Sequence, residues 1–375
     1  MNEKEFKVTP YEVKGTVDYN KLIEQFGIKR LDSKILNKIK EITKKDSHYL
    51  RREIYFAHRD LKWALDEYEK GNKFFLYTGC GPSGPVHLGH VIGIWEFVKW
   101  LQETFDVELW FQFTDDEKFL YKDKSYEEIQ KWTYENMLDV IAMDFDPKKT
   151  HFLIDTKHAG IMYPEAIKVA KKITFSTIKA AFGFTDSNNI GSIFYTAMQT
   201  VPVFLPNVLN KTNKPCLIPL GFDQDPHFRI SRDVIEKLGH QKPAIMHAKM
   251  MPAITGIDEK MSSTDHEKAI LMTDSPKVVK NKINKYAFSG GRDTIEEHRK
   301  FGGNPDIDVA YQWLIYLEEN DEKLKQIHDD YKSGKLLSGE LKQILIDKIN
   351  NYLTKHQERR SKITQKDIDK FIYKI

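Results

Sequence analysis

The 375-residue sequence contains only two cysteines, Cys80 and Cys216. Two thiols so far apart in the chain supply neither a disulfide framework nor the four-cysteine set of a structural zinc site. We therefore expect a chain that folds in a reducing compartment and has no dedicated metal site.

Long hydrophobic runs are also missing. No apolar stretch approaches the roughly 20 residues that a membrane helix needs. The first residues, MNEKEFKVTPYEV, carry acids where a signal peptide has an apolar core and where a transit peptide avoids Glu. These features predict a cytoplasmic protein that does not enter a membrane.

Neither sign of charge dominates, because the sequence has 58 Lys and Arg residues and 55 Asp and Glu residues, which gives a formal net charge of +3. Nucleic acid binding depends on where positive charges gather, so this balance makes no global case for it. Any site for a polyanion must be local. Internal repeats are absent too, and the length allows two or three domains of roughly 100–200 residues each.

The most distinctive stretch that is present is TGCGPSGPVHLGHVIG, residues 78–93. A short apolar run at 74–77 precedes it, and apolar residues at helical spacing follow it over 91–105. A strand, a glycine-rich turn and a helix open a βαβ unit. Further strands are expected at 107–113, 215–220 and 244–246, and a helix from Thr114. The middle of the chain is therefore predicted as α/β, with a doubly wound, mostly parallel sheet.

The two ends of the chain have a different pattern. Residues 1–60 are polar and rich in lysine, with an expected hairpin around Thr9–Pro10 and helical spacing over 18–45. Another helix is expected over 58–70, and from 275 onward the strand signal fades into helical patterns. The predicted parts are an extension (1–60), an α/β domain (61–274) and a helical domain (275–375). The sequence leaves two arrangements open for the last residues, which either stay with the helical domain or fold back on the α/β domain.

The glycine-rich turn lacks the Lys of the GxxxxGK[ST] phosphate loop. Instead, His87 and His90 flank Gly89 at the helix start, where both imidazoles can donate to phosphate oxygens. Alone, two histidines at this spacing would more often only cap the helix, and a metal would need further ligands. A second polar segment, Lys260 to Thr264, offers a lysine and three hydroxyls in a loop after the last strand.

Residues 82–90 and 260–264 resemble the HIGH and KMSKS signatures of class I aminoacyl-tRNA synthetases. Longer stretches resemble the eukaryotic and archaeal type of tryptophanyl-tRNA synthetase, and the resemblance covers nearly everything after about residue 15. These stretches are residues 77–79, 113–118, 182–187, 223–226 and 287–299.

The resemblance implies activation of L-tryptophan with ATP and Mg²⁺, followed by transfer to the 3′ end of tRNA(Trp). The attacking carboxylate is already ionised, so catalysis rests on positioning and charge stabilisation rather than on a general base. A homodimer is also implied, formed through residues at about 155–205.

The resemblance assigns site residues one by one. Catalytic roles fall to His87, His90, Lys118, Lys260 and Ser262. Contacts with ATP fall to Thr78, Gly79, Cys80, Gly81, Gly89, Met250, Met261 and Ser263. Contacts with tryptophan fall to Tyr77, Gln112, Glu117, Gln199, Gln224 and Phe228. Contacts with the tRNA anticodon fall to Arg292 and Asp293.

The residue types assigned to tryptophan suit its chemistry. Indole has one N–H donor and no acceptor, so its pocket needs aromatic walls and an acceptor, while the ammonium needs a carboxylate or amide oxygens. Gln112 and Glu117 are expected at the carboxyl edge of the sheet, although either alone would more often be a surface residue. A buried acceptor would reject phenylalanine by as much as ~10⁴–10⁵, so no editing domain is needed.

The sequence departs from the family at three points, and three alternatives stay open. Cys80 replaces an Arg common in eukaryotic relatives, the turn at 83–86 is one residue shorter than in the animal enzymes, and Thr264 stands where Ser is usual. The alternatives are a tyrosyl-tRNA synthetase, an HxGH nucleotidylyltransferase, which would lack the KMSST stretch, and a non-catalytic RNA-binding paralogue, which would be expected to have lost His90 or Lys260.

Overall fold

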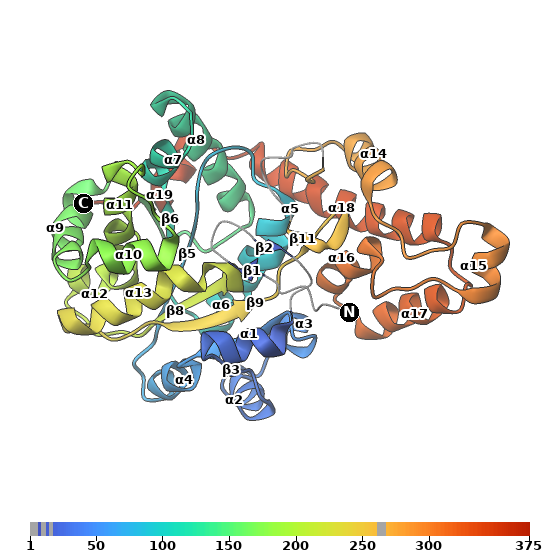
Figure 1. Cartoon of the computed structure of the whole chain (residues 1–375), viewed down its shortest axis with the longest axis horizontal. Helices are drawn as coiled ribbons and strands as arrows, with labels where there is room; N and C mark the ends of the chain where they lie inside the picture. Colours follow the sequence, from blue (N-terminus) through green and yellow to red (C-terminus); the bar gives the residue numbers. More distant parts are fainter. Residues whose placement is uncertain (1–6, 9–12, 15–17, 261–267) are drawn as a thin grey trace.

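The computed structural model describes residues 7–8, 13–14, 18–260 and 268–375, without the side chains of 7–8, 13–14 and 259–260. Within these residues a seven-stranded sheet lies at the centre of the molecule (Figure 1). Its order is β3 (Lys29–Arg30), β4 (Tyr55–Arg59), β9 (Ala244–Ala248), β8 (Cys216–Gly221), β5 (Phe75–Cys80), β6 (Leu109–Phe113) and β7 (Thr150–Ile154).

The five strands from β9 to β7 are parallel, and β3 and β4 add an antiparallel edge. The doubly wound, mainly parallel α/β fold expected from the sequence is therefore confirmed. Because β5 lies between β6 and β8, the strand order switches direction at β5. Ligands of such sheets bind at this switch, beyond the carboxyl ends of the strands.

The sheet separates two apolar cores. Leu76 and Phe111 face one core, whereas their neighbours Tyr77 and Trp110 face the other. This alternation follows from the two-residue period of a strand, and continuous apolar runs are typical of strands covered on both faces.

Helices and helical turns cover both faces of the sheet (Figure 1). They are α4 (Leu61–Glu69), α5 (Leu88–His90), η1 (Val91–Trp95), α6 (Glu96–Phe105), α7 (Asp115–Tyr121), α8 (Tyr126–Ala142), α9 (Ala159–Ala170), α10 (Phe175–Phe182), α11 (Ile190–Met198), η2 (Val201–Val203), α12 (Leu205–Asn210), η3 (Phe222–Gln224), α13 (Asp225–Ile235) and η4 (Glu236–Leu238). None of the helices in the described ranges is long and apolar enough to cross a membrane.

The N-terminal extension differs from the sequence prediction in two places. Helical spacing over 18–45 resolves into α1 (Tyr19–Phe26) and α2 (Ser33–Thr43), because Gly27 takes a left-handed conformation (φ 60°) and β3 follows it. The expected helix over 58–70 is wrong at its start, since residues 55–59 form β4 and α4 begins at Leu61. A short helix, α3 (His48–Arg51), precedes β4.

Two short antiparallel pairs lie outside the main sheet. β1 (Lys7–Val8) pairs with β2 (Val13–Lys14), and the turn predicted at Thr9–Pro10 lies outside the described residues. β10 (Pro252–Ala253) pairs with β11 (Gly256–Lys260), which also contacts β2. The N-terminal extension therefore reaches the strand that leads into the KMSST segment.

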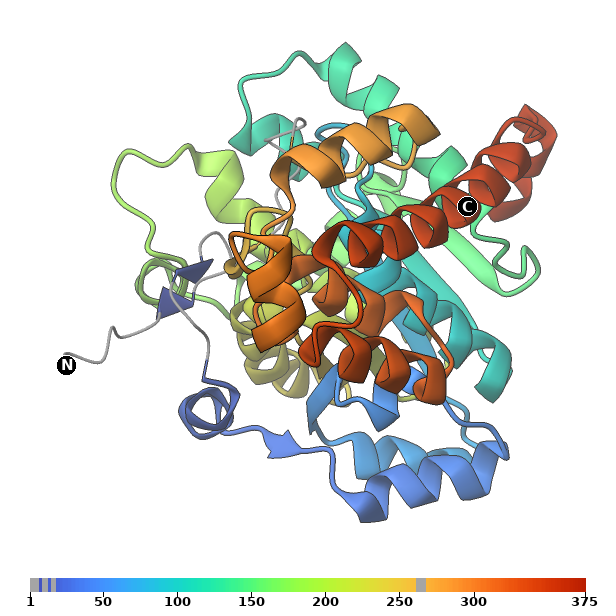
Figure 2. The same cartoon turned by 90° about the vertical axis from the view of Figure 1, so that its right-hand side faces the viewer.

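The described residues after 274 contain helices and no named strand, and this part faces the viewer in Figure 2. The helices are α14 (Pro276–Tyr286), α15 (Ile295–Phe301), α16 (Val309–Leu317), α17 (Asp321–Lys332), α18 (Ser338–Arg360) and α19 (Gln365–Phe371). α18 packs on α14 and α16 and also on α8, and the N–H of Tyr373, after α19, donates to the carbonyl of Phe152 in β7 (3.1 Å). The chain thus ends beside the α/β part.

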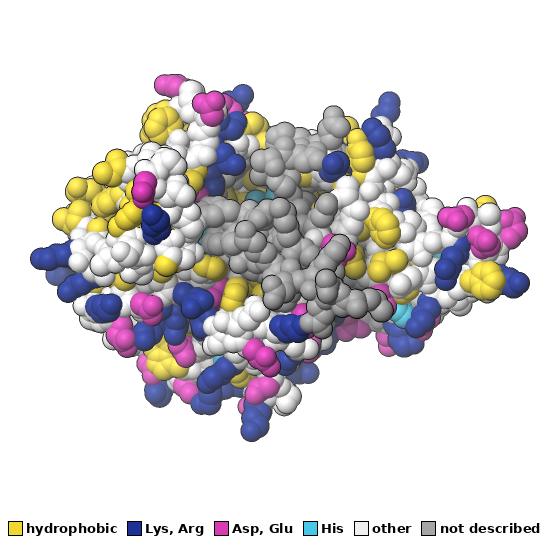
Figure 3. All heavy atoms as spheres, viewed as in Figure 1, with side chains coloured by type: hydrophobic (Ala, Val, Ile, Leu, Met, Phe, Trp, Pro, Cys, Tyr) yellow, Lys and Arg dark blue, Asp and Glu magenta, His cyan; other side chains and the backbone are white. Residues whose placement is uncertain are grey.

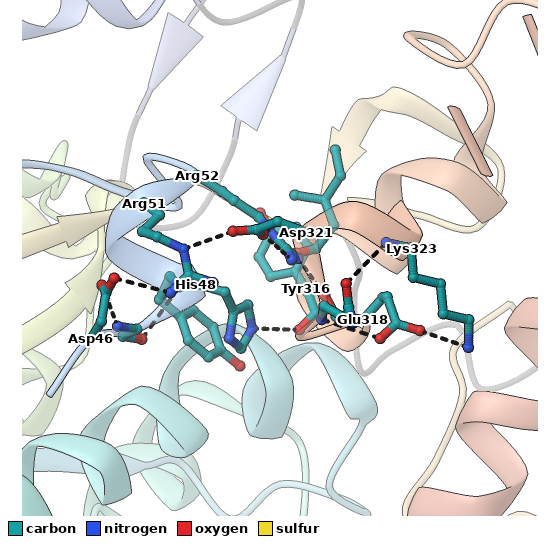
Figure 4. Close-up of polar contacts among 12 residues, drawn as sticks. Asp46, His48, Arg51, Arg52, Tyr316, Glu318, Asp321 and Lys323 are labelled. Atoms are coloured by element: carbon teal, nitrogen blue, oxygen red, sulfur yellow. Dashed lines mark hydrogen bonds and ion pairs between the residues drawn. The ribbon is translucent and has the colours of Figure 1, made fainter. Parts of the chain in front are cut away.

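Polar contacts join the N-terminal extension to the helical part (Figure 4). Arg52, just after α3, donates from Nη1 to the carbonyls of Ile315 (2.7 Å) and Glu318 (2.5 Å) at the end of α16. Both Arg51 and Arg52 also pair with Asp321 at the start of α17. Parts that are far apart in the sequence are therefore joined by ion pairs and by bonds to partly buried backbone carbonyls.

Candidate functional site

A pocket of about 440 Å³ lies at the carboxyl ends of β5, β6 and β8. It collects every predicted catalytic, ATP and tryptophan residue whose side chain the structure describes. These residues are Tyr77, Thr78, Gly79, Cys80, Gly81, His87, Gly89, His90, Gln112, Glu117, Lys118, Gln199, Gln224, Phe228 and Met250.

The two histidines of the signature lie face to face. His87 is the residue before α5, His90 ends it, and their ring centroids are 4.0 Å apart with 24° between the planes. Extended backbone next to His87 pairs with the chain beyond the KMSST segment, because the N–H of Leu88 donates to the carbonyl of Ile270 (2.8 Å). This pairing places the first signature next to the chain that follows the second one.

Two glycines at the end of β5 allow close packing below the pocket. A Cβ on Gly79 would lie 2.5 Å from the carbonyl oxygen of Gln112 in β6. A Cβ on Gly81 would lie 1.6 Å from Cε of Lys118, so the lysine side chain occupies the space that this glycine leaves. The glycine-rich turn thus determines where the Lys118 ammonium can lie.

Opposite charges lie side by side in the pocket. Lys118 Nζ is 2.9 Å from Glu117 Oε1, and Thr114 Oγ1 donates to Glu117 Oε2 (2.6 Å). Burial disfavours the ionised form of Glu117, but Lys118 and Thr114 outweigh it and lower the pKa of this carboxyl. Glu117 is therefore an anion at neutral pH, next to a cation that can turn toward phosphate.

A chain of hydrogen bonds crosses the opposite wall. The Tyr77 hydroxyl donates to Gln112 Oε1 (2.5 Å), and Gln199 Nε2 donates to the Tyr77 oxygen (3.1 Å). Tyr195 donates to Oε1 of Gln199, and the ring of Phe228 lies edge-on to that of Tyr77 with centroids 6.0 Å apart. This wall combines aromatic surface with hydrogen-bond acceptors, as an indole requires.

Several pocket residues lie outside the sequence predictions. Asp223, His227 and Lys249 line the pocket, and Asp155 bonds to Gln112 from behind the wall. Burial lowers the pKa of His227 to about 4 and also lowers the pKa of Lys249. The DQDP stretch could have indicated His227, which follows Asp223 by one helical turn, but no local signal marks Asp155.

Cys80 adds no charge to the pocket. Its side chain packs against the main apolar core, and burial raises the pKa of the thiol above its ordinary value. Within the described residues, no group of three or more His, Cys, Asp or Glu side chains could hold a metal ion.

Some predicted residues are not brought to this pocket by the described part of the chain. Met261, Ser262 and Ser263 lie outside the described residues, and of Lys260 only the backbone, at the end of β11, is described. Arg292 and Asp293 are exposed just before α15, at the far right of Figure 1. Arg292 donates from Nε to the carbonyl of Gly302 (3.1 Å).

Comparisons with known proteins agree with this geometry. The family model for class I tRNA synthetases (W and Y) matches residues 69–354. The chain is 50% identical over 361 residues to the tryptophan–tRNA ligase of Sulfolobus acidocaldarius, with 96% of this chain and 93% of the relative covered. It is 46% identical to the cytoplasmic tryptophan–tRNA ligase of Saccharomyces cerevisiae, with 98% and 89% covered.

A solved structure supports the same assignment. The tryptophanyl-tRNA synthetase of Plasmodium falciparum superposes with a TM-score of 0.90 at 43% identity, and the match covers 95% of this chain and 98% of that one. Because the family model, the relatives and the fold agree over nearly the whole chain, the chain belongs to the tryptophanyl-tRNA synthetases of class I.

Proposed function

We propose that the pocket at the carboxyl ends of β5, β6 and β8 performs the reaction of this family. Tryptophan and ATP give tryptophanyl-adenylate and pyrophosphate, and the tryptophanyl group then passes to the 3′ end of tRNA(Trp). One observation carries the proposal: a single pocket joins an acceptor-bearing aromatic wall to the paired histidines and to Lys118.

The amino acid side of the pocket follows from its polar groups. Tyr77, Gln112 and Gln199 offer acceptors to the indole N–H, and Phe228 supplies aromatic surface. Glu117, held ionised, receives the ammonium together with Gln224, as charge complementarity favours. A tyrosine site would want an acid facing the phenol, whereas the groups at Tyr77 are amides, so tryptophan is the better fit.

The nucleotide side has the donors that a triphosphate needs. His87, His90 and Lys118 donate to phosphate oxygens, while Gly89 and Met250 lie against the adenosine beside Thr78, Gly79, Cys80 and Gly81. Magnesium would be supplied with ATP rather than by a dedicated protein site, and it would neutralise part of the charge of the phosphates. The tryptophan carboxylate attacks the α-phosphorus in line, the bond to pyrophosphate breaks, and positioned donors stabilise the charge that develops.

Exchange of labelled pyrophosphate into ATP tests the proposal, with tryptophan and tyrosine supplied separately. We expect exchange with tryptophan and a rate at least ~10³ lower with tyrosine. Absence of exchange with both amino acids would remove the activity, and preference for tyrosine would replace it by the related synthetase.

Lys260 is proposed to meet the β- and γ-phosphates as pyrophosphate leaves, with Met261, Ser262 and Ser263 on the same segment. The substitution Lys260→Ala should slow adenylate formation by about 10²–10³, because it removes a charge-assisted donor to the transition state. Tryptophan affinity should change by less than about threefold. Single-turnover formation of adenylate measures the first quantity and equilibrium titration the second; an unchanged single-turnover rate would exclude this role.

Binding of tRNA and self-association complete the proposal. Arg292 and Asp293 would read the anticodon, because both are exposed and a carboxylate can accept from a base edge. The segment at 155–205 would form a homodimer, supported by exposed apolar side chains on α9 to α11, which lie at the left of Figure 3. A cytosolic location for this chain is supported by the yeast relative, whose name includes the word cytoplasmic.

A further inference from the structure

Asp155 lies behind the aromatic wall of the pocket without lining it. It follows β7 directly, is 1% exposed, and its N–H donates to the carbonyl of Phe113 (3.2 Å). Since β6 pairs with β7 in the register Gln112–Leu153, the Asp155 carboxyl meets the Gln112 side chain. Gln112 Nε2 is 2.8 Å from each oxygen of Asp155.

This contact fixes which end of the Gln112 amide faces the pocket wall. Lone pairs on Asp155 require the NH₂ end, so the carbonyl oxygen Oε1 points the other way, where it accepts from the Tyr77 hydroxyl. The Tyr77 hydroxyl therefore uses its only proton in the hydrogen bond to Gln112. Lone pairs of the Tyr77 oxygen are left for a donor, and Gln199 Nε2 is one donor that reaches them. The wall therefore presents acceptors, which is what the single N–H donor of indole requires.

A second carboxyl, that of Asp116, lies beside Asp155. Asp116 hydrogen-bonds to Asp155, and the N–H of Glu117 donates to Asp116 Oδ1 (2.7 Å). Burial, together with the charge of Asp116, raises the pKa of Asp155 well above its ordinary value, and burial raises that of Asp116. Gln112 Nε2 is 2.8 Å from both Asp155 oxygens, and each of these oxygens keeps a lone pair when the carboxyl is protonated, so the amide still meets an acceptor.

We propose that Asp155 is a positioning residue for tryptophan selectivity, which orients the Gln112 amide so that Gln112 and Tyr77 present acceptors to the indole N–H. It acts through Gln112 and does not touch the substrate. The inference rests on the proposed tryptophan site and adds to it the group that determines the direction of its hydrogen bonds.

Replacing Asp155 by Asn tests this role, because an Asn side chain both donates and accepts and leaves the amide of Gln112 free to turn. The probe is a tryptophan analogue in which sulfur replaces the indole N–H. For Asp155→Asn, we expect kcat/KM in pyrophosphate exchange to fall about 10- to 100-fold with tryptophan and less than threefold with the analogue. The KM for ATP should stay within about twofold.

Asp115→Asn provides a matched control. Asp115 is another buried acid, at the start of α7, but it bonds to Gln130 and Thr156 rather than to Gln112. Its replacement should leave the ratio of kcat/KM for tryptophan to kcat/KM for the analogue unchanged, whatever it does to stability. If Asp155→Asn does not fold, Asp155→Ser takes its place with the same expected loss, because a hydroxyl also donates and accepts.

A double-mutant cycle separates positioning from mere support of the fold. In a Gln112→Ala background, Asp155→Asn should change kcat/KM for tryptophan by less than about twofold, since its partner is gone. Equal loss with tryptophan and with the analogue, or additive loss in the cycle, would overturn the role. If the wild-type chain shows no tryptophan-dependent exchange, the proposed function itself is wrong. If wild-type exchange is normal but Asp155→Asn leaves the ratio of kcat/KM for tryptophan to kcat/KM for the analogue unchanged, only this inference is wrong.

Discussion

Gly79 and Gly81 stand two residues apart at the end of β5, yet alanine should affect them in different ways. A methyl on Gly79 would press on the backbone oxygen of Gln112 in the next strand, which cannot move without disturbing the sheet. A methyl on Gly81 would meet the flexible end of the Lys118 side chain, which can swing aside.

We therefore expect Gly79→Ala to lower the free energy of unfolding by about 1–3 kcal/mol, a usual cost of overpacking. Gly81→Ala should change it by less than about 0.5 kcal/mol but slow pyrophosphate exchange at least ~10-fold, because Lys118 is displaced from its place beside Glu117. Urea unfolding and exchange assays measure both quantities. The reverse pattern, a stable Gly79→Ala and an unfolded Gly81→Ala, would contradict this account.

Residues of the pocket that belong to continuous stretches can be predicted from the sequence, because a family signature and its position at a strand end specify them. Glu117 is such a residue, Gln112 directly precedes the same stretch, and the pocket brings both together. The partner of Gln112 cannot be predicted in this way. Asp155 faces Gln112 only because β6 and β7 pair in one register, and nothing local in the sequence specifies that register.

At the scale of single elements, α13 is held at its first residue by a buried ionic cluster. Asp225 accepts from Arg59 Nε (3.0 Å) and Nη2 (2.8 Å) and contacts His247 Nε2 (2.7 Å). The cluster fixes the start of the helix that carries Phe228. Burial alone would raise the pKa of Asp225, but the bonds from His247 and Arg59 outweigh it and lower the pKa to about 2.

A carboxyl with a lowered pKa stabilises the fold above its ordinary pKa, and this contribution is lost as the pH falls from about 4 toward 2. We expect Asp225→Asn to lower the free energy of unfolding by about 3 kcal/mol at pH 7, since Arg59 loses its carboxylate partner. Of this, about 2 kcal/mol should disappear on acidification to pH 2. Urea unfolding across pH measures the difference between the two proteins.

The exposed Asp123 serves as the control, and Asp123→Asn should change stability by less than about 0.5 kcal/mol, as is usual for an exposed position. A gap between wild type and Asp225→Asn that stays constant from pH 7 to pH 2 would contradict the assigned charge state.

Element boundaries show where sequence patterns are ambiguous. The strands at 75–80 and 109–113 can be predicted, because apolar runs end there at glycine or at a helix start. The strand at 55–59 cannot be told from a helix, since its residues are buried almost throughout and show no alternation. Pairing with β9, which lies about 190 residues later, decides the matter.

At the scale of the whole molecule, Arg52 links the N-terminal extension to the helical part. Its side chain is 10% exposed and supplies donors to two carbonyls at the end of α16 as well as to Asp321. Arg51 pairs with the same aspartate but is 38% exposed. We expect Arg52→Ala to lower the free energy of unfolding by about 2–3 kcal/mol, because two partly buried carbonyls and Asp321 lose a charged donor.

Arg51→Ala is the matched control, since it removes the same charge and a bond to the same partner. An exposed ion pair contributes at most about 1 kcal/mol, so the control should stay close to wild type. Thermal unfolding followed by circular dichroism compares the two variants. Equal losses would show that the pairing with Asp321, and not the bonds to the α16 carbonyls, stabilises this contact.

The assembly of the proposed dimer depends on the exposed apolar side chains of α9 to α11. Ile167 is 47% exposed on α9, one turn after Tyr163, which is 54% exposed. An aspartate at 167 would be buried without a partner in an interface, which costs several kcal/mol, so Ile167→Asp should halve the mass in sedimentation at micromolar concentration. The control Ile295→Asp places the same charge on an equally apolar, 61% exposed position of α15, outside the segment, and should stay dimeric. A wild-type monomer, or an Ile167→Asp protein that sediments as wild type, would assign these side chains to another role.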